Sequence, residues 1–208
     1  EVTLDMFTAL EPYKNITAVK DSTRDITNLT RMINSFGDRF QILCGVDTIA
    51  MEALLMGAKG WVAGLVDAFP EETVAIYSYC RGGEVEKARS VFRWFLPLLE
   101  LDISPQLVQN IKLCELATGL GTGYVRPPRL PLKGAELDRV KAIIKNLAKD
   151  CNDLINEGIS SVAIMSNDTI NYPEDSFDNM IKFSKENNFN KINYLFDETQ
   201  KIAKKYGA

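Results

Sequence analysis

The sequence predicts an α/β protein, and two observations carry this prediction. Three short apolar runs are each followed by a segment whose apolar residues recur at helical spacing. After residue 83 the pattern becomes helical, and two further apolar runs follow in the last third. Short apolar strands that alternate with amphipathic helices form parallel βα units. We therefore expect a parallel sheet in the first part of the chain and a second, smaller α/β segment after it.

Each element has a local justification. The predicted strands are 15–20, 40–45 and 60–66, and each is a short apolar run. In the first helix, Ile26, Leu29 and Met32 recur at helical spacing, and Asp47 or Thr48 is a candidate N-cap of the second. The predicted helices are 3–13, 24–37, 47–58, 73–83, 84–99, 104–120 and one from about 135.

The composition changes near residue 139. Residues 1–138 hold 18 of the 21 Gly and Pro residues and only 4 of the 14 Asn residues. We therefore predict two domains, 1–138 and 139–208. In the second domain we expect a helix over 138–158, strands near 160–166 and 191–196, and two further helices.

Charge and residue usage exclude several functions. The chain has 208 residues, 46% of them hydrophobic, and a net charge of −4, which does not suit a nucleic-acid surface. No apolar run is long enough to cross a membrane, and no signal peptide is visible. The absence of histidine excludes Ser-His-Asp, Cys-His and His-metal chemistry. We expect a cytoplasmic protein, and the missing initiator methionine suggests a fragment.

The four cysteines give no sign of a metal site or a disulfide framework. Cys44, Cys80, Cys114 and Cys151 are widely spaced, and no CxxC pair occurs. Buried, reduced thiols are the expected state of such cysteines.

Lys20 ends the first predicted strand, in the stretch NITAVKDS. Parallel sheets and barrels place their chemistry at the carboxyl ends of strands. A lysine amine attacks a ketone only when unprotonated, so a reactive lysine needs a pKa lowered by desolvation or by a nearby cation. On this local pattern alone, Lys20 is either a nucleophile or an ordinary lysine at the end of a strand.

Three stretches together give a wider context. NITAVKDSTRD (15–25), ILCGVDTIAMEALLMGAKGWVAGLVDAFPEE (42–72) and GLGTGYVRPPRLPL (119–132) resemble the dihydrodipicolinate synthase / N-acetylneuraminate lyase family, in order and spacing. The resemblance covers about residues 1–138 and corresponds to the C-terminal half of that family. It implies a partial (β/α)8 barrel with C-terminal helices, and class I aldolase-type lyase or deaminase chemistry on a 2-oxo acid.

The resemblance also implies site residues. Lys20 falls on the Schiff-base lysine of the family, Gly45, Val46 and Asp47 fall on a loop that lines the pocket, and the backbone at Val62 would face the substrate. No cofactor or metal is implied. The substrate would be pyruvate or a pyrroline carboxylate, because 60–70 and 125–132 are closer to the pyrroline-4-hydroxy-2-carboxylate deaminases than to the lysine-biosynthesis enzyme.

Other parts of the family pattern are missing from the sequence. Neither a YNNP-like tyrosine nor a GTTGE-like carboxylate-binding loop is present. Three strands cannot close a barrel that needs eight strands and about 250 residues. We therefore expect impaired catalysis, and either a homo-oligomer or association through exposed barrel edges.

Residues 140–188 and 194–208 resemble a second family, the thioredoxin-like proteins of the alkyl hydroperoxide reductase / thiol-specific antioxidant type, chiefly in SNDTINYPEDS (166–176). The CxxC of that family is absent. Cys151 lies within a predicted helix rather than at its N-terminus, so we interpret it as structural. Three hypotheses stay open: a Schiff-base lyase, a thiol redox protein without its CxxC, and a non-catalytic chimera of two truncated proteins.

Overall fold

The computed structural model describes residues 2–156, 162–165, 182, 185 and 193–196. The chain divides into two compact units, Glu1–Pro105 and Gln106–Ala208, and each is described by itself. The elements of the first unit are α1 (Leu4–Thr8), β1 (Ala18–Asp21), α2 (Ile26–Phe36), β2 (Gln41–Cys44), η1 (Asp47–Ile49), α3 (Ala50–Leu55), β3 (Gly60–Trp61), η2 (Leu65–Asp67), α4 (Pro70–Arg81), α5 (Val85–Leu99) and η3 (Glu100–Ile103), where η denotes a 3-10 helix. Those of the second are α6 (Leu107–Thr118), α7 (Gly134–Asn156), β4 (Val162–Met165) and β5 (Asn193–Phe196).

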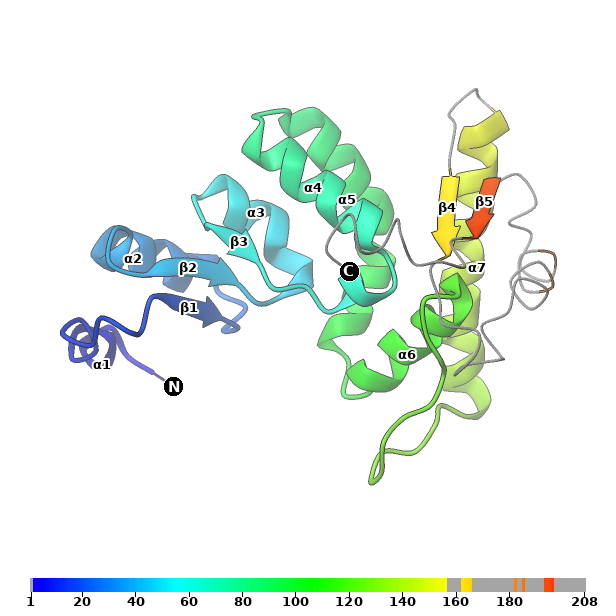
Figure 1. Ribbon diagram of the computed structural model, residues 1–208, viewed down its shortest axis with the longest axis horizontal. Helices are drawn as coiled ribbons and strands as arrows, with labels where there is room; N and C mark the ends of the chain where they lie inside the picture. Colours follow the sequence, from blue (N-terminus) through cyan, green and yellow to red (C-terminus); the bar gives the residue numbers. More distant parts are fainter. Residues whose placement is uncertain (1, 157–161, 166–181, 183–184, 186–192, 197–208) are drawn as a thin grey trace. The chain divides into compact units, whose positions relative to one another are not determined.

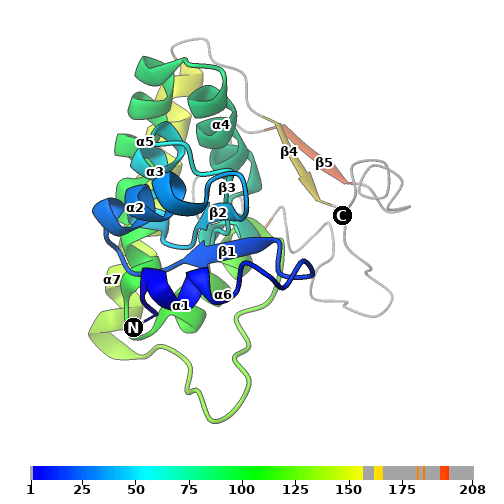
Figure 2. The same cartoon turned by 90° about the vertical axis from the view of Figure 1, so that its left-hand side faces the viewer.

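The sheet of the first unit is parallel, with the strand order β1-β2-β3 (Figure 1). Ile42 and Cys44 of β2 are buried, whereas Gln41 is exposed and Leu43 is half-buried. Helices α2 and α3 contact the sheet on the buried face (Figure 2). Because side chains alternate along a strand, Gln41 and Leu43 lie on the other face of the sheet. In the first unit of this chain that face is open.

Local sequence explains where the helices begin. The Asp25 side chain caps α2 by accepting a hydrogen bond from the Thr27 N–H at 2.8 Å. Helix α4 starts at Pro70, whose fixed φ and missing N–H suit the first helical position. The three βα units predicted from the sequence are confirmed in this part of the chain.

The core of the first unit lies where α4 and α5 pack against each other and against α3. Phe69 and Phe95 meet edge to face at 5.5 Å between ring centroids. Phe95 is fully buried, which contributes on the order of 2–3 kcal/mol of hydrophobic stabilisation. Ile76 and Leu99 are also fully buried. This packing holds the segments at the carboxyl ends of the strands, including η3.

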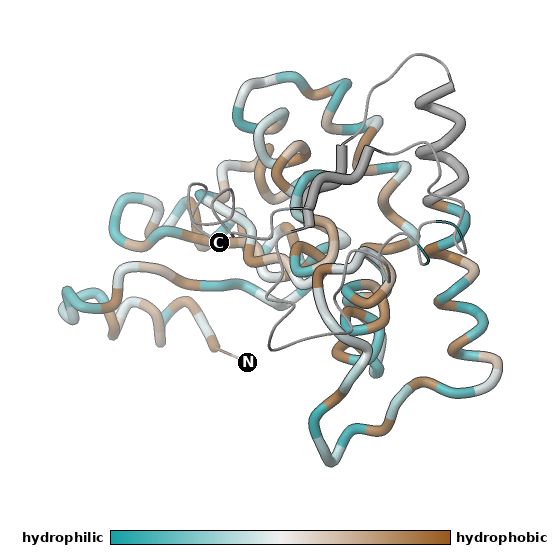
Figure 3. Tube along the Cα trace, turned by 45° about the vertical axis from the view of Figure 1, so that its right-hand side comes forward, coloured by the Kyte–Doolittle hydropathy of each residue, from teal (hydrophilic) through white to brown (hydrophobic). Residues whose placement is uncertain are grey.

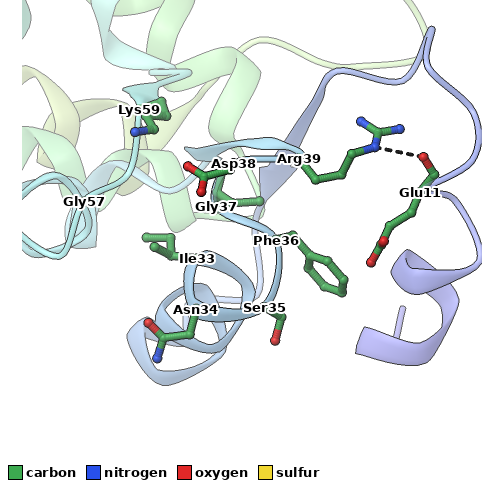
Figure 4. Close-up of a pocket in the computed structure, with 11 residues that line it drawn as sticks. Glu11, Ile33, Asn34, Ser35, Phe36, Gly37, Asp38, Arg39, Gly57 and Lys59 are labelled. Atoms are coloured by element: carbon green, nitrogen blue, oxygen red, sulfur yellow. Dashed lines mark hydrogen bonds between the residues drawn. The ribbon is translucent and has the colours of Figure 1, made fainter.

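Arg39 fixes the chain that leads into β1. Its guanidinium donates to the carbonyl oxygens of four residues: Leu10 at 3.4 Å, Glu11 at 2.9 Å, Tyr13 at 2.8 Å and Ile16 at 2.8 Å. Figure 4 shows the bond to Glu11. The helix predicted over 3–13 is therefore too long, because α1 ends at Thr8. The carbonyl groups of Leu10 and Tyr13 accept both from Arg39 and from the N–H three residues on, in turns rather than in a continued helix.

The strand predicted over 60–66 is also too long, because β3 covers Gly60–Trp61 only. The N–H groups of Gly64 and Leu65 donate to the carboxylate of Asp47 rather than to a neighbouring strand. The chain then turns into η2.

The second unit contains α6 and α7, joined by the predicted loop, which includes a cis peptide between Pro127 and Pro128. Along α7, the buried residues Val140, Ile144 and Leu147 recur at helical spacing, and Figure 3 shows the alternation of apolar and polar residues there. Strands β4 and β5 are parallel and paired, at the positions expected for two strands.

The predicted domain boundary at 138/139 lies inside α7 and stays a prediction. The two predicted helices and the stretch 166–176 fall outside the described residues. Among the described residues, no helix has the length and apolar character that a membrane span requires.

Candidate functional site

Lys20 lies near the carboxyl end of β1, in register with Leu43 of β2. Val19 and Asp21 share the helix-covered face with Ile42 and Cys44, so Lys20 lies on the open face. Its side chain is exposed. The structure thus places this lysine at the end of a parallel sheet where chemistry is usually found, and leaves it accessible.

The Lys20 side chain lies over Gly45. A Cβ atom at position 45 would be 2.7 Å from Lys20 Cγ and 2.5 Å from Ser22 Oγ, closer than carbon and oxygen atoms approach without displacement. Two hydrogen bonds join the same loops: the Gly45 N–H donates to the Asp21 carbonyl at 2.8 Å, and Ser22 Oγ donates to the Gly45 carbonyl at 3.3 Å. Gly45 therefore makes room for the lysine stem.

Asp47 is completely buried and joins the loops after β2 and β3. Its carboxylate accepts from Trp61 Nε1 at 2.9 Å, from the Gly64 N–H at 3.1 Å and from the Leu65 N–H at 2.9 Å. Burial raises the Asp47 pKa to about 6, although the hydrogen bond from Leu65 opposes the shift. This geometry suits a residue that positions the loops.

The other residues predicted to bind substrate differ in their exposure to solvent. Val46 is 4% exposed and Val62 is 44% exposed. The Val62 N–H donates to the Cys44 carbonyl at 2.8 Å, and this bond fixes the backbone of Val62 relative to β2. Near the strand ends, Gly45 is thus half-buried and Val62 exposed, whereas Val46 and Asp47 are buried.

Asp102, in η3, belongs to the same end of the sheet, and sequence reasoning missed it. Its carboxylate accepts a hydrogen bond from the Asp47 N–H at 3.3 Å. Burial raises the Asp102 pKa, while the Asp47 N–H and the positive charges of Lys20 and Arg24 lower it. No local motif marks Asp102, because it follows a helix and its contact with Asp47 spans 55 residues of sequence.

The groove that Figure 4 shows lies at the opposite end of the strands. It has a volume of about 410 Å³ and is lined by the end of α2 together with residues that precede β2 and β3, among them Asp38, Arg39 and Lys59. Because the sheet is parallel, these positions are remote from the carboxyl ends that carry Lys20. The groove is therefore not part of the candidate site.

The thiols offer little reactivity. Cys44, Cys80 and Cys114 are buried and form no disulfide. Burial raises the pKa of all three, to about 12 for Cys114, and a high pKa disfavours the nucleophilic thiolate. Cys151 lies within α7, and its side chain is outside the described residues. No group of three or more metal-ligating side chains occurs in the part of the chain that the structure describes.

Known proteins match this chain over its first two thirds. The model of the dihydrodipicolinate synthetase family matches residues 1–147. The 4-hydroxy-tetrahydrodipicolinate synthase of Geotalea daltonii is 28% identical over 139 residues, covering 65% of this chain and 47% of the relative. That of Methanopyrus kandleri is 30% identical over 139 residues, covering 67% and 45%.

Solved structures give the same result for the fold. The 4-hydroxy-tetrahydrodipicolinate synthase from Methylacidiphilum fumariolicum superposes with a TM-score of 0.68 at 23% identity, over 75% of this chain and 52% of that one. A dihydrodipicolinate synthase from Bacillus anthracis gives 0.65 at 25% identity, over 70% and 50%. The fold match supports the predicted partial barrel.

The matches also bear on the predictions of a thioredoxin-like segment and of a chimera. They give no support to a thioredoxin-like segment or to a chimera, and the beginning of the predicted segment, 139–147, falls inside the family match. The matched residues are the N-terminal part of this chain, and their assignment to the C-terminal half of the family is not established by these matches. The chain spans about half the length of the curated relatives. Over residues 1–147, it belongs to the dihydrodipicolinate synthetase family.

Proposed function

We propose that this chain carries the Schiff-base lysine of a lyase that acts on 2-oxo acids, and that Lys20 is this lysine. The observation that carries the proposal is the position of Lys20: the carboxyl end of a parallel strand, on the open face, with Gly45 making room for its stem. The names of the relatives, 4-hydroxy-tetrahydrodipicolinate synthases, support the reaction class.

The chemistry requires one free amine and one ketone. The neutral Lys20 amine attacks the ketone carbon of pyruvate, and the carbinolamine loses water to give an imine. Borohydride then delivers a hydride to the imine carbon and leaves a stable secondary amine. Gly45 and Val62 lie close enough to the strand ends to present backbone groups to the rest of the substrate, while Asp47 holds their loops.

Adduct formation and turnover are separate measurements, because positioning and proton transfer each contribute orders of magnitude to rate. Pyruvate and a hydroxy-pyrroline carboxylate are the two substrates to compare.

The test is a borohydride trap on the full chain. The protein is incubated with each compound, reduced, and analysed by intact and peptide mass. We expect one reduced adduct on Lys20, absent in Lys20→Arg and retained in Lys59→Arg, which changes an exposed lysine at the other end of the strands. No adduct from folded protein would contradict the proposal and support the non-catalytic alternative.

A further inference from the structure

The carboxylate of Asp47, which the sequence predicts to bind substrate, is already fully occupied. Its Oδ1 accepts from Trp61 Nε1 at 2.9 Å and from the Gly64 N–H at 3.1 Å. Its Oδ2 accepts from the Leu65 N–H at 2.9 Å and from the Gly64 N–H at 3.2 Å. Because the side chain is also completely buried, a small molecule finds no free oxygen on it. The role of Asp47 therefore has to be sought in the segment that it holds.

The segment 62–65, which follows β3, depends on this carboxylate. The Val62 N–H donates to a carbonyl group of β2 at 2.8 Å. In the part of the chain that the structure describes, the N–H groups of Gly64 and Leu65 have Asp47 as their acceptor and no other. One side chain from the loop after β2 thus takes the place of a partner strand for the backbone beyond β3.

A proton on this carboxylate necessarily removes some of these bonds. An ionised carboxylate only accepts hydrogen bonds, whereas a protonated one has an O–H donor on one of its oxygens. A proton on Oδ1 competes with Trp61 and a proton on Oδ2 competes with Leu65, because each oxygen faces an N–H group at 2.9 Å. The bonds to the other oxygen also weaken, since they are no longer charge-assisted. The hold on residues 62–65 therefore depends on the charge of Asp47.

The surroundings of Asp47 keep both charge states accessible. Burial and the nearby Asp102 carboxylate favour the protonated form, the three N–H donors favour the ionised form, and the resulting pKa is about 6. The charge of Asp47 acts in turn on the buried Cys44, and the charges of Lys20 and Arg24 act on Asp102. The remaining charged side chains of the neighbouring elements α3, α5, η2 and η3 are exposed: Glu52, Asp67, Glu86, Lys87, Arg89, Arg93 and Glu100.

We propose that Asp47 is a positioning residue whose ionised carboxylate holds the segment 62–65 in place, and that uptake of a proton by this carboxylate releases the segment. Gly60 lies in the same row across the three strands as Lys20, so the segment starts at the end of the sheet that carries the lysine. Release displaces this backbone and slows the reaction at Lys20. This effect on the reaction rests on the proposed function, whereas the release itself does not.

The first measurement follows the indole N–H signals of Trp61 and Trp94 by NMR between pH 4.5 and 8, with Trp61→Phe to assign them. The Trp61 signal should shift with a midpoint near pH 6, because its N–H donates to the titrating carboxylate. Trp94 Nε1 has no acceptor among the described residues, so its signal should stay constant and serves as a control within the same molecule.

Amide hydrogen exchange measures the release itself. A pKa of about 6 leaves about one tenth of the carboxylates ionised at pH 5, so the protection factors of the Gly64 and Leu65 N–H groups should fall about tenfold between pH 7 and pH 5. The Val62 N–H, which donates to β2, should keep its protection. In Asp47→Asn the low protection should persist at every pH. Asp67→Asn, at an exposed site in η2, is the matched control and should behave as the wild type.

A Trp61 signal that does not titrate, or exchange at Gly64 and Leu65 whose protection does not change with pH, would overturn the proposal. So would the same titration in Asp47→Asn, since another group would then be responsible. If Asp47→Asn does not fold, Trp61→Phe takes its place. It removes one donor from the ionised form, so the loss of protection should move to higher pH, and an unchanged midpoint would contradict the role of this bond.

Trapping with pyruvate at Lys20 tests the link to the reaction. Cyanoborohydride reduces imines at pH 5 and at pH 7, and the ratio of the trapping rates of the wild type and Asp47→Asn cancels the titration of the lysine. This ratio should be about ten at pH 7 and about two at pH 5. If the segment is released but no adduct forms at any pH, the proposed function fails and the release stands. If adducts form with a ratio that does not depend on pH, Asp47 does not position the reaction.

Discussion

At the scale of single residues, the contact between Lys20 and Gly45 links sequence to chemistry most directly. The lysine stem occupies the volume that a Cβ atom at position 45 would need. The atoms in the way, Lys20 Cγ and Ser22 Oγ, belong to side chains that can rotate, so displacement costs little stability. Displacement of the lysine stem instead changes the position of the Lys20 amine relative to the ketone that the amine attacks.

Gly45→Ala should therefore leave the Tm close to that of the wild type and lower the rate of borohydride trapping at Lys20 by about tenfold or more, because misplacement of a reacting group by about 1 Å has effects of this size. Gly60→Ala is the matched control: it lies on the next strand and meets only the Leu43 side chain, at 3.2 Å. Wild-type trapping in Gly45→Ala would show that the amine does not depend on this contact.

Asp47 gives a prediction about pH. Its pKa rises from 3.8 to about 6 on folding, mainly through burial and with a further contribution from Asp102, so the folded chain holds this proton more tightly than the unfolded chain. The resulting stabilisation is fully present below about pH 4 and is lost as the pH rises through 6. The shift corresponds to roughly 3 kcal/mol.

The measurement is the free energy of unfolding in urea between pH 4 and 7, for the wild type and for Asp47→Asn. The difference between the two should fall over this interval, because the variant has no such proton. Asp102→Asn should move the transition to lower pH, since it removes the neighbouring negative charge. Parallel pH profiles of the wild type and Asp47→Asn would disprove the shift.

At the scale of elements, Arg39 acts as a clamp on the segment between α1 and β1. It donates to four carbonyl groups within residues 10–16 and lies 4.2 Å from the Phe40 ring centroid, so one side chain fixes the entry into the first strand. The five N–H groups of a guanidinium make this possible, and lysine has only a point charge.

Arg39→Lys should therefore cost roughly 1–3 kcal/mol and loosen residues 9–16 while the rest of the first unit stays protected. Hydrogen exchange by mass spectrometry measures both effects. Arg93→Lys, an exposed site on α5, is the control and should change neither. Unchanged exchange in residues 9–16 of Arg39→Lys would mean that other contacts hold this segment.

The sequence predicted the elements where local pattern determines them and failed where distant side chains intervene. The three βα units and the helices predicted over 84–99, 104–120 and 138–158 follow from periodicity and capping, and the structure confirms them as α5, α6 and α7. Two elements end early where distant side chains bind the backbone: Arg39 donates to carbonyl groups in the turns after α1, and Asp47 accepts from the N–H groups after β3. Neither partner is close in sequence to the element that it shortens.

The candidate site likewise combines features that follow from local sequence with features that depend on distant residues. The sequence indicated the position of Lys20 and Gly45 at the strand ends, because strand order and loop position are local features. It could not indicate that Asp47 and Val46 are buried, nor that Asp102 joins the site across 55 residues. The strained φ of Arg24 is likewise invisible in a sequence, since it results from how Asp21 and Asp25 hold the loop.

At the scale of the whole molecule, the open edges of the sheet determine how the chain can associate with other strands. Within the described residues, β1 and β3 each have only β2 as a neighbour, so their outer edges carry unpaired backbone groups. The relatives are about twice as long as the part matched here. Exposed edges of this kind recruit further strands, from another copy or from another polypeptide.

We expect this chain to self-associate through the outer edge of β1. The carbonyl groups of Thr17 and Asp21 accept from β2, so the backbone of the alternate residues, Ala18 and Lys20, points toward the free edge. Ala18→Pro removes an N–H from that edge and leaves the bonds to β2 in place. In sedimentation velocity, the wild type should show a sedimentation coefficient that rises with concentration, and Ala18→Pro a smaller rise at an unchanged Tm. A wild type that stays monomeric at every concentration would contradict edge association, and it would mean that the side chains around β1 already protect the edge that the backbone leaves open.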